Sequence, residues 1–490
     1  MAKFIRYEKK GDILYASVYN PVRVDGNKIN YVEYLGKVID QVNGIFKSKD
    51  RGVFKFSLED GYSYDGIECY SNEKEKFILD FGDIFIFFNR FKDSKLYNIF
   101  KNIIYNRSDT LFSLIFYKIF QSESNSYAKI WWEGSYARKL FPNASLNSQR
   151  ISEFLIELGD ESNQREFFNE YLKLFSDNDK KCGLIDSTGL PNTIDIPLTA
   201  LSNHMGNIEV EMRLIYIVDK KTKRPLFFRY IAGNIIDVTT LETTMLEMKE
   251  LNLDIEFLLL DAGYFSEDNI KKMYDKGMDF ITRMPTNRKV YKELIKKYRE
   301  KIEKIENLVN FNGRLIYIIK EQIELYGKVV YAYICVDVQR KNEEMYKLLT
   351  NSLEGDKDCD KIEEETITKG TFVIVSPLNI ETKEILSMYY SRQEIERIFE
   401  ICKSLINILP LRCHSEATLR GCLMLAFLAS LTYIELNEYL KGSKVNMTYA
   451  INMLRNLKCK VYENSTIILE PTKQMKDIAE LFKLEFPTSL

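Results

Sequence analysis

Apolar residues between positions 180 and 286 form short strand-like runs that alternate with stretches of helical spacing. Three apolar runs come first, and two more follow, each after a stretch in which apolar residues recur every three or four positions. The predicted strands are 182–185, 212–218, 226–231, 255–260 and 279–283, and the predicted helices are 239–251 and 268–276. Three strands followed by helix, strand, helix and strand predict an α/β fold in which helices flank a mixed sheet.

The pattern changes on both sides of this core. The N-terminal stretch contains short β-type runs broken by Gly, Asn and Asp, and an aromatic-rich helical stretch follows it. After residue 286 the alternation is lost until a strand at 371–376 and a long helix from about 382 to 405 continue it, and the acidic run 354–365 predicts a solvated loop. We predict six regions: 1–75, small and β-rich; 76–178, helical; 179–286, the first part of the core; 287–370, a β-rich insertion; 371–440, the second part of the core; and 441–490, a C-terminal region.

Charge is balanced over the whole chain. The 490 residues include 69 Lys and Arg against 71 Asp and Glu, which excludes nucleic-acid binding through bulk positive charge but permits local basic patches. The densest basic stretch, 283–304, contains Lys292, Lys296, Lys297 and Arg299. Gln149 and Arg150 lie on the polar face of a predicted helix at 146–156, which would suit a helix lying on DNA. An ordinary amphipathic helix is the simpler explanation of this second pattern.

Several classes of protein and site are disfavoured. The eight Cys include no CxxC pair, which argues against a Cys-rich zinc site and favours a reducing cytoplasm. No signal-peptide-like segment is found, and the most apolar run, 422–434, is too short to span a bilayer and predicts a buried helix. Phosphate-loop, dinucleotide-binding and HExxH motifs are absent. We therefore expect a cytoplasmic protein with no membrane partner.

Two carboxylates follow predicted strands directly. Asp186 ends the first core strand, and Asp261 ends the fourth. A carboxylate in this position lies at the rim of the sheet, where ligands bind in such folds. For either residue alone, a turn or a helix cap is the simpler explanation.

A third carboxylate lies on the long helix predicted near the end of the core. Tyr389, Arg392, Glu396 and Lys403 are spaced so that one continuous helix would present all four on the same face. Taken alone, Arg392 and Glu396 could also be an ordinary ion pair on a solvated helix.

Taken together, these features resemble the DDE transposases of bacterial insertion sequences, in the cut-and-paste subgroup marked by Tyr-x2-Arg-x3-Glu-x6-Lys. Tyr389, Arg392, Glu396 and Lys403 match that signature at every position. Residues 233–240, 261–266 and 411–429 resemble segments that flank the catalytic residues of this family. The likeness covers roughly residues 180–490, with a weaker likeness at 34–37 and 146–156.

The resemblance implies an RNase H-like core in which Asp186, Asp261 and Glu396 are the catalytic residues and hold two divalent metal ions, Mg²⁺ or Mn²⁺. Three carboxylates agree with this assignment because hard cations prefer oxygen ligands. The resemblance further implies that Tyr389, Arg392 and Lys403 grip DNA phosphates, and that a homodimer joins the element's terminal inverted repeats to target DNA. Residues 76–178 would then bind the DNA ends, in a bacterial cytoplasm and at the nucleoid when DNA is bound.

One feature departs from the subgroup. Members that form a DNA hairpin stack a flipped base on a Trp of the insertion, whereas both Trp here, at 131 and 132, lie far upstream. A tyrosine of the insertion could offer a stacking face instead; the candidates are Tyr291, Tyr298, Tyr317, Tyr326, Tyr331, Tyr333 and Tyr346. Two alternatives to a transposase stay open: an RNase H-like metal-dependent nuclease, and a domesticated DNA-binding protein.

Overall fold

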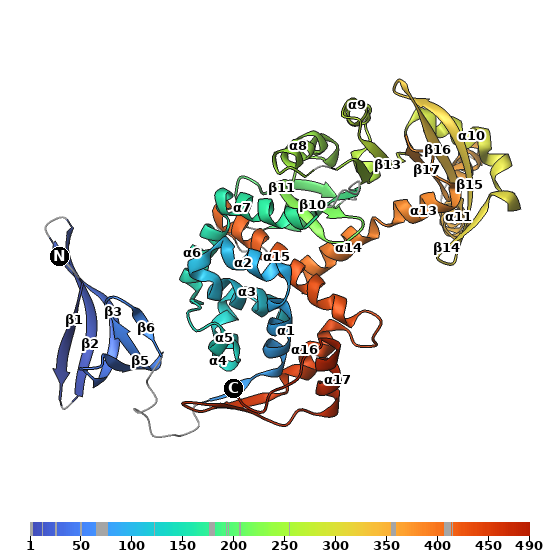
Figure 1. Ribbon diagram of the computed structural model, residues 1–490. Helices are drawn as coiled ribbons and strands as arrows, with labels where there is room; N and C mark the ends of the chain where they lie inside the picture. Colours follow the sequence, from blue (N-terminus) through green and yellow to red (C-terminus); the bar gives the residue numbers. More distant parts are fainter. Residues whose placement is uncertain are drawn as a thin grey trace. The chain divides into compact units, whose positions relative to one another are not determined.

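The structure, a computed structural model, consists of two compact units. It describes residues 3–11, 13–24, 27–49, 51–64, 77–121, 123–175, 182–192, 194, 196–204, 207–253, 255–353, 359–405, 413 and 415–490. The first unit comprises 1–82, 453–479 and 485–490, and the second comprises 83–452 and 480–484. Figure 1 labels the elements along the chain.

The first unit contains two antiparallel sheets. Six strands form a meander in chain order around a core of Ala16, Val18, Leu35, Phe46 and Phe54. These strands are β1 (Phe4–Lys10), β2 (Ile13–Val24), β3 (Asn27–Asp40), β4 (Ile45–Ser48), β5 (Gly52–Ser57) and β6 (Gly61–Ser63). The second sheet has the order β19-β18-β7 and is formed by β7 (Phe77–Asp80), β18 (Lys458–Val461) and β19 (Thr466–Ile468). Two helices, α16 (Met447–Arg455) and α17 (Lys473–Leu481), contain residues of both units.

A ten-stranded mixed sheet forms the centre of the second unit. Its order is β11-β10-β8-β12-β13-β17-β16-β15-β14, and β9 pairs with β10 alone. The strands are β8 (Cys182–Pro191), β9 (Ala200–His204), β10 (Asn207–Asp219), β11 (Pro225–Ala232), β12 (Phe257–Leu260), β13 (Asp279–Met284), β14 (Leu308–Phe311), β15 (Arg314–Leu325), β16 (Lys328–Asp337) and β17 (Thr371–Ser376). The predicted α/β class, a large mixed sheet with flanking helices, is confirmed.

Helices flank this sheet. The first helices after the core begins are α8 (Asp237–Glu250) and α9 (Glu267–Asp275), and they are followed by α10 (Lys289–Ile302), α11 (Val338–Leu353), α12 (Cys359–Thr368), α13 (Thr382–Tyr390), α14 (Gln393–Glu400) and α15 (Glu416–Asn437). Figure 1 shows α8 and α9 on one side of β10 and β11, with α14 and α15 on the other. All five strands and both helices predicted between residues 180 and 286 are confirmed, with slightly different bounds.

The stretch from 287 to 370 is not purely β. It contains α10, α11 and α12 as well as three strands, and β16 pairs with β17 so that these strands extend the central sheet. The acidic run 354–365 was expected to be a solvated loop, but its described part from Cys359 onward is helical. This expectation is wrong because Glu and Lys are good helix formers, so charge alone does not oppose a helix.

An aromatic-rich helical region precedes the sheet. Its helices are α1 (Gly82–Lys92), α2 (Lys95–Ile103), α3 (Ser108–Gln121), α4 (Ala128–Gly134), α5 (Ala137–Leu140), α6 (Ser148–Leu158) and α7 (Glu161–Leu172). Rings from α1 and α3 interlock: Phe88 lies 5.8 Å from Phe116 and 5.9 Å from Phe112 between ring centroids. Such offset and edge-on pairs add to the stabilisation that burial of the rings provides.

The buried helix predicted at 422–434 is confirmed as part of α15. The stretch Glu416–Leu440 is long and apolar enough to cross a membrane by length and composition, but 67% of its most apolar window is buried inside the protein, as in a core helix.

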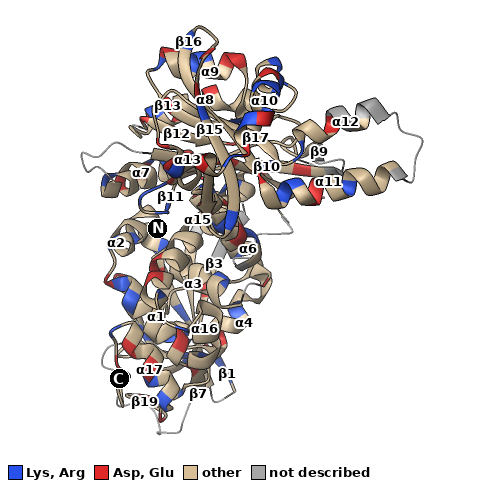
Figure 2. Ribbon diagram, turned by 90° about the vertical axis from the view of Figure 1, so that its right-hand side faces the viewer, with Lys and Arg blue, Asp and Glu red and all other residues tan. Residues whose placement is uncertain are grey.

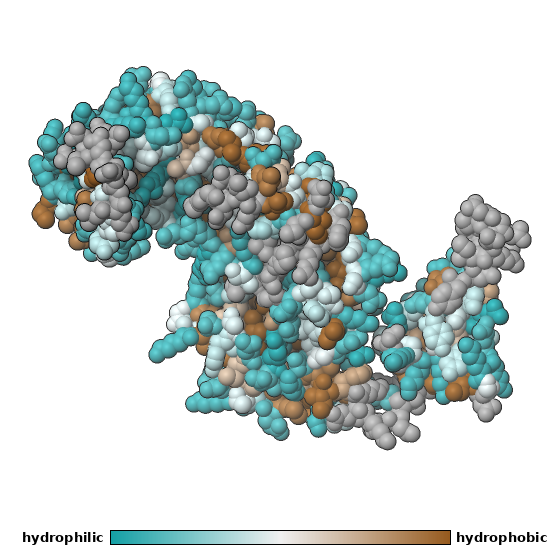
Figure 3. Space-filling model, turned by 180° about the vertical axis from the view of Figure 1, so that it is seen from behind, coloured by the Kyte–Doolittle hydropathy of each residue, from teal (hydrophilic) through white to brown (hydrophobic). Residues whose placement is uncertain are grey.

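On the face that Figure 3 shows, hydrophobic residues lie in small groups among hydrophilic ones.

Helices α6 and α15 cross where each contributes a glycine. A Cβ added at Gly421 would overlap the carbonyl oxygen of Leu155, and one added at Gly159 would press on the backbone of Gly421 and Ala417. The two backbones are therefore closer than any side chain permits.

Gly421→Ala should lower the free energy of unfolding by about 2 kcal/mol, because the backbone of α6 must move away from α15. Gly134→Ala is the matched control, since a Cβ there meets no atom within 4 Å. Urea denaturation checks both variants, and equal stabilities of the two would contradict the close approach.

Candidate active site

The strand register places Asp186 and Asp261 side by side. Strands β8 and β12 are parallel, and Ile185 pairs with Leu260, so the next residue of each strand is a carboxylate at the same edge. Asp186 is largely buried, with 16% of its side chain exposed, whereas Asp261 is 43% exposed. Asp261 directly follows the end of β12, as predicted, whereas Asp186 does not end its strand: β8 continues to Pro191, and Asp186 lies within it, just beyond the last residue that pairs with β12.

The third carboxylate reaches this edge on α14. An aromatic contact fixes that helix against the sheet: the fully buried Tyr216 of β10 lies 5.4 Å from Phe399 of α14 and 6.0 Å from Phe427 of α15 between ring centroids. Tyr216 pairs directly with Asp186 across the antiparallel ladder, so both side chains lie on the same face of the sheet. Glu396, one turn along α14, is 62% exposed.

Arg392 joins the three carboxylates. Its guanidinium forms a hydrogen-bonded ion pair with Asp261, and it lies 3.6 Å from Asp186 Oδ2 and 3.9 Å from Glu396 Oε1. The Arg392 side chain is only 14% exposed and also lies 3.4 Å from the hydroxyl of Tyr389. Asp186, Asp261 and Glu396 therefore converge on one cationic group.

The spacing predicted one continuous helix for the four signature residues, and this prediction is wrong. Tyr389 belongs to α13, Arg392 lies at the joint before α14, and Lys403 lies in a π-helical turn at Ile401–Leu405. At the joint, the Ser391 hydroxyl donates to the carbonyl oxygen of Met388 at 2.6 Å. Such side-chain hydrogen bonds to the backbone compete with helix propagation.

Burial perturbs the acidity of this cluster. It raises the pKa of Asp186 to about 6, with the neighbouring Asp261 carboxylate adding to the rise and Arg392 opposing it. Burial also raises the pKa of Tyr389 to about 12. Burial by itself would lower the pKa of Arg392, but the charges of Asp186 and Asp261 hold it above its usual value. Perturbed groups of this kind are typical of functional sites.

The model of the transposase DDE domain family matches residues 178–432, just over half of the chain. The chain belongs to the DDE transposase family. It is also similar to the piggyBac transposase in a synaptic complex with hairpin DNA, with 11% identity over 76% of this chain and 79% of that chain and a TM-score of 0.40. No relative is found among curated proteins. The predicted resemblance to DDE transposases is confirmed, whereas the insertion-sequence origin and the Tyr-Arg-Glu-Lys subgroup stay predictions.

DDE transposases generally use divalent metal ions, and the donor set of this site suits them. Three carboxylates surround a single positive charge, and carboxylate oxygens are the ligands that Mg²⁺ and Mn²⁺ prefer. In the part of the chain that the structure describes, no three acidic, His or Cys side chains already form a metal-sized cluster. The residues fit a metal ion in charge and chemistry, while Arg392 occupies the position between them.

Lys403 approaches the cluster from the π-helical turn. Its ammonium donates to the Thr188 hydroxyl at 2.6 Å, two residues beyond Asp186 on the same strand. Burial lowers the pKa of Lys403.

Asp237 is a fourth carboxylate of this edge, and the sequence reasoning did not assign it a role. Its Oδ1 accepts from the Ser187 hydroxyl at 2.6 Å and lies 3.1 Å from Arg213, with both charged side chains largely buried. Asp237 begins α8 and falls within 233–240, a segment already similar to the family. That similarity, together with an acidic residue in the first turn of a helix, was the available signal.

The four basic residues of the predicted DNA-binding stretch lie on α10 but differ in their partners. Lys297 pairs with Glu321, and Arg299 lies 2.8 Å from Glu303. Lys292 and Lys296 are exposed and form no ion pair with any residue that the structure describes. Figure 2 shows basic and acidic residues interspersed along this helix.

The two polar residues predicted to face DNA on α6 are exposed and share one partner. Gln149 donates to Glu153 at 3.1 Å, and Arg150 lies 2.8 Å from the same carboxylate. The amphipathic pattern itself is confirmed, because the apolar residues of α6 are buried. A DNA contact at this helix stays a prediction.

The aromatic residues considered for base stacking are unequally accessible. Trp131 is buried among core rings, and Trp132 donates its indole N–H to the Phe141 carbonyl oxygen at 3.1 Å. Within the insertion, Tyr291 and Tyr333 are fully buried, whereas Tyr346 is 74% exposed. Burial excludes the first two tyrosines from stacking.

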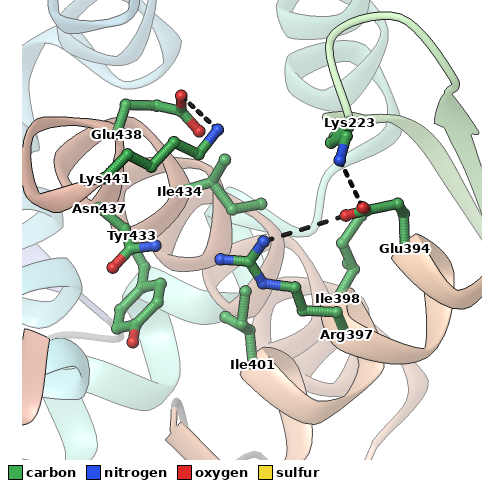
Figure 4. Close-up of a pocket in the computed structure, with 10 residues that line it drawn as sticks. All are labelled: Lys223, Glu394, Arg397, Ile398, Ile401, Tyr433, Ile434, Asn437, Glu438 and Lys441. Carbon is green, nitrogen blue, oxygen red and sulfur yellow. Dashed lines mark hydrogen bonds and ion pairs between the residues drawn. The ribbon is translucent and has the colours of Figure 1, made fainter. Parts of the chain in front are cut away.

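Other positions of α14 line a small hollow that contains no predicted site residue. Figure 4 shows Arg397 pointing toward Glu394, which Lys223 also contacts at 2.6 Å. The cations of this hollow are thus already paired.

Asp186→Asn should stabilise the metal-free chain at pH 8 but hardly at pH 4. The folded-state pKa of about 6 exceeds the ordinary 3.8, so stability from the neutral carboxyl is complete below pH 3.8 and is lost as the pH rises through 6. At about 1.4 kcal/mol per pKa unit, the gain at pH 8 should be about 3 kcal/mol. Urea denaturation in EDTA measures it, and equal effects at both pH values would refute the assignment.

Lys292→Gln with Lys296→Gln should weaken DNA binding by this transposase and reduce its salt dependence by about two counterions, because neither lysine has an anionic partner among the residues that the structure describes. Lys297→Gln with Arg299→Gln is the matched control, with a smaller expected change since Glu321 and Glu303 already engage these side chains. Fluorescence anisotropy of a labelled duplex across a KCl series gives both slopes. Identical slopes for the wild type and the first variant would show that α10 does not contact DNA.

Proposed function

We propose that this DDE transposase cleaves DNA at the terminal inverted repeats of its own insertion sequence and joins the 3′ ends to target DNA by two-metal-ion phosphoryl transfer. The observation that carries the proposal is the convergence of Asp186, Asp261 and Glu396 on one cationic group at the edge of the sheet. Three carboxyl groups gathered around one positive charge suit a site that concentrates cations.

The order of the central strands supports an RNase H-like core. Strands β11, β10 and β8 are antiparallel neighbours, and β12 and β13 continue the sheet parallel to β8. This arrangement sets Asp186, within β8, beside Asp261 at the carboxyl end of β12, and ligands bind at such strand ends in α/β sheets.

Each site residue has a role in this proposal. Asp186, Asp261 and Glu396 would hold Mg²⁺ or Mn²⁺, which when bound activate a water or a DNA 3′-OH and stabilise the leaving oxygen. Tyr389, Arg392 and Lys403 would hold the phosphates beside the scissile one. Arg392 suits a bidentate phosphate contact and Lys403 a point-charge contact.

The partners follow from the same reaction. Two ends of one element must be brought together, so we propose a homodimer in the synaptic complex with double-stranded DNA. The setting would be a bacterial cytoplasm, with the protein at the nucleoid when it is bound to DNA. Inverted repeats flanking the reading frame would support this assignment directly.

The proposal predicts that Asp186→Asn, Asp261→Asn and Glu396→Gln each abolish cleavage of a labelled duplex carrying those repeats. Binding of the duplex should survive, because these residues hold metal and not the DNA backbone. Cleavage should require Mg²⁺ or Mn²⁺, and Ca²⁺ should not support it because its looser geometry suits in-line displacement poorly. Any variant that cleaves at the wild-type rate would remove its residue from the site.

The DNA products of the reaction distinguish a transposase from the two alternative functions. A transposase gives cleaved ends that become joined to a target plasmid, whereas an RNase H-like nuclease gives cleavage without joining. A domesticated DNA-binding protein gives neither product.

Lys403→Ala should slow single-turnover cleavage by about a hundredfold through misplaced DNA, since small errors of position have effects of this size. Raising Mg²⁺ should not restore the rate, because the ammonium contacts Thr188 and not a triad carboxylate. Lys441→Ala is the control, since Lys441 pairs with Glu438 away from the cluster. An unchanged rate for Lys403→Ala would contradict the phosphate contact.

A further inference from the structure

Arg392 carries a positive charge in a site whose metal ligands would be negatively charged. Its guanidinium lies among the three carboxylates assigned to the metal ions, and it is less exposed than Asp261 or Glu396. A positive charge in that position repels a divalent cation and competes with it for the carboxylates.

The contacts of Arg392 are those of a counter-ion that is only partly hydrogen-bonded. Asp261 accepts a hydrogen bond from it, but the separations from Asp186 and Glu396, at 3.6 and 3.9 Å, are too long for hydrogen bonds. Its Nε is buried and has no hydrogen-bond partner among the residues that the structure describes. Charge attraction therefore holds the guanidinium in place more than directional bonding does.

We propose that Arg392 is the internal counter-ion of the carboxylate triad, and that metal ions load only as its guanidinium leaves. This inference rests on the proposed metal site. Without a cation, three negative charges at one partly buried edge would repel one another, and Arg392 offsets that repulsion. When a metal ion takes over this role, the guanidinium is released to another anion, and a DNA phosphate offers the bidentate geometry that suits it.

The position of Arg392 in the chain permits such a change of partner. It lies at the joint between α13 and α14, beside Ser391, and not within either helix. A residue at a helix joint can move its side chain without disturbing the packing of Phe399 against Tyr216, which fixes α14.

The test is a calorimetric titration of the DNA-free, full-length chain with MnCl₂. Arg392→Gln should bind Mn²⁺ at least about tenfold more tightly than the wild type, because a competing charge within about 4 Å has been removed. Arg392→Lys, which keeps the charge, should show a smaller gain. Arg397→Gln is the matched control on the neighbouring helix α14, because Arg397 contacts Glu394 and not the triad, and the Mn²⁺ affinity of this variant should stay at the wild-type value.

The outcomes distinguish this inference from the proposed function. If Asp261→Asn weakens Mn²⁺ binding but Arg392→Gln does not strengthen it, the metal site stands and the counter-ion role fails. If neither Asp186→Asn nor Asp261→Asn alters binding, the proposed metal site fails and the counter-ion role fails with it.

A thermal melt tests the proposal even if Arg392→Gln is less stable than the wild type. A loss of stability is expected because removing Arg392 leaves carboxylates unpaired. In EDTA, Arg392→Gln should melt below the wild type, and saturating Mn²⁺ should raise its melting temperature more than that of the wild type. An equal or smaller rise would overturn the proposal even for a poorly stable variant.

Discussion

Two carboxylates side by side on adjacent parallel strands repel each other, and burial of one of them strengthens the repulsion. The pairing of Ile185 with Leu260 makes this arrangement unavoidable, because it sets Asp186 beside Asp261. A third carboxylate from α14 adds to the negative charge. The edge is stable only with a counter-charge, and the arrangement of the surrounding elements supplies one.

The counter-charge comes from an element distant in the sequence. Arg392 is 131 residues beyond Asp261 and reaches it because α14 is fixed to the sheet. The contact of Tyr216 with Phe399 and Phe427 provides that attachment, and it lies on the face of the sheet to which Asp186 also belongs. The apolar packing of α14 and α15 against Tyr216 thus determines where Arg392 lies relative to the carboxylates.

Much of this arrangement could be predicted from the sequence. The alternation between residues 180 and 286 determines the strands and helices of the core because buried parallel strands and amphipathic helices leave distinct patterns. Asp186 and Asp261 could be found because each directly follows a run of buried strand residues. The signature around Glu396 pointed to the same family that the domain match shows.

Other features depend on contacts that no local pattern contains. The break between α13 and α14 coincides with a hydrogen bond from the Ser391 hydroxyl to the backbone, and the spacing of residues in the sequence cannot reveal such a break. The bridging position of Arg392 requires three elements to be folded together. The helix α12 replaced an expected loop because the run of charges also consists of helix formers. Asp237 escaped notice because its partners, Ser187 and Arg213, come from two other strands.

The central claim is that Asp186, Asp261 and Glu396 hold divalent metal ions for phosphoryl transfer. The most direct test is a structure of the chain bound to a duplex carrying the element's terminal repeat, with Mn²⁺ located by its anomalous scattering. The account predicts anomalous peaks at about 2.0–2.2 Å from oxygens of these three carboxylates, with the Arg392 guanidinium on a DNA phosphate. A complex in which no Mn²⁺ lies at these carboxylates while the scissile phosphate is in place would contradict it.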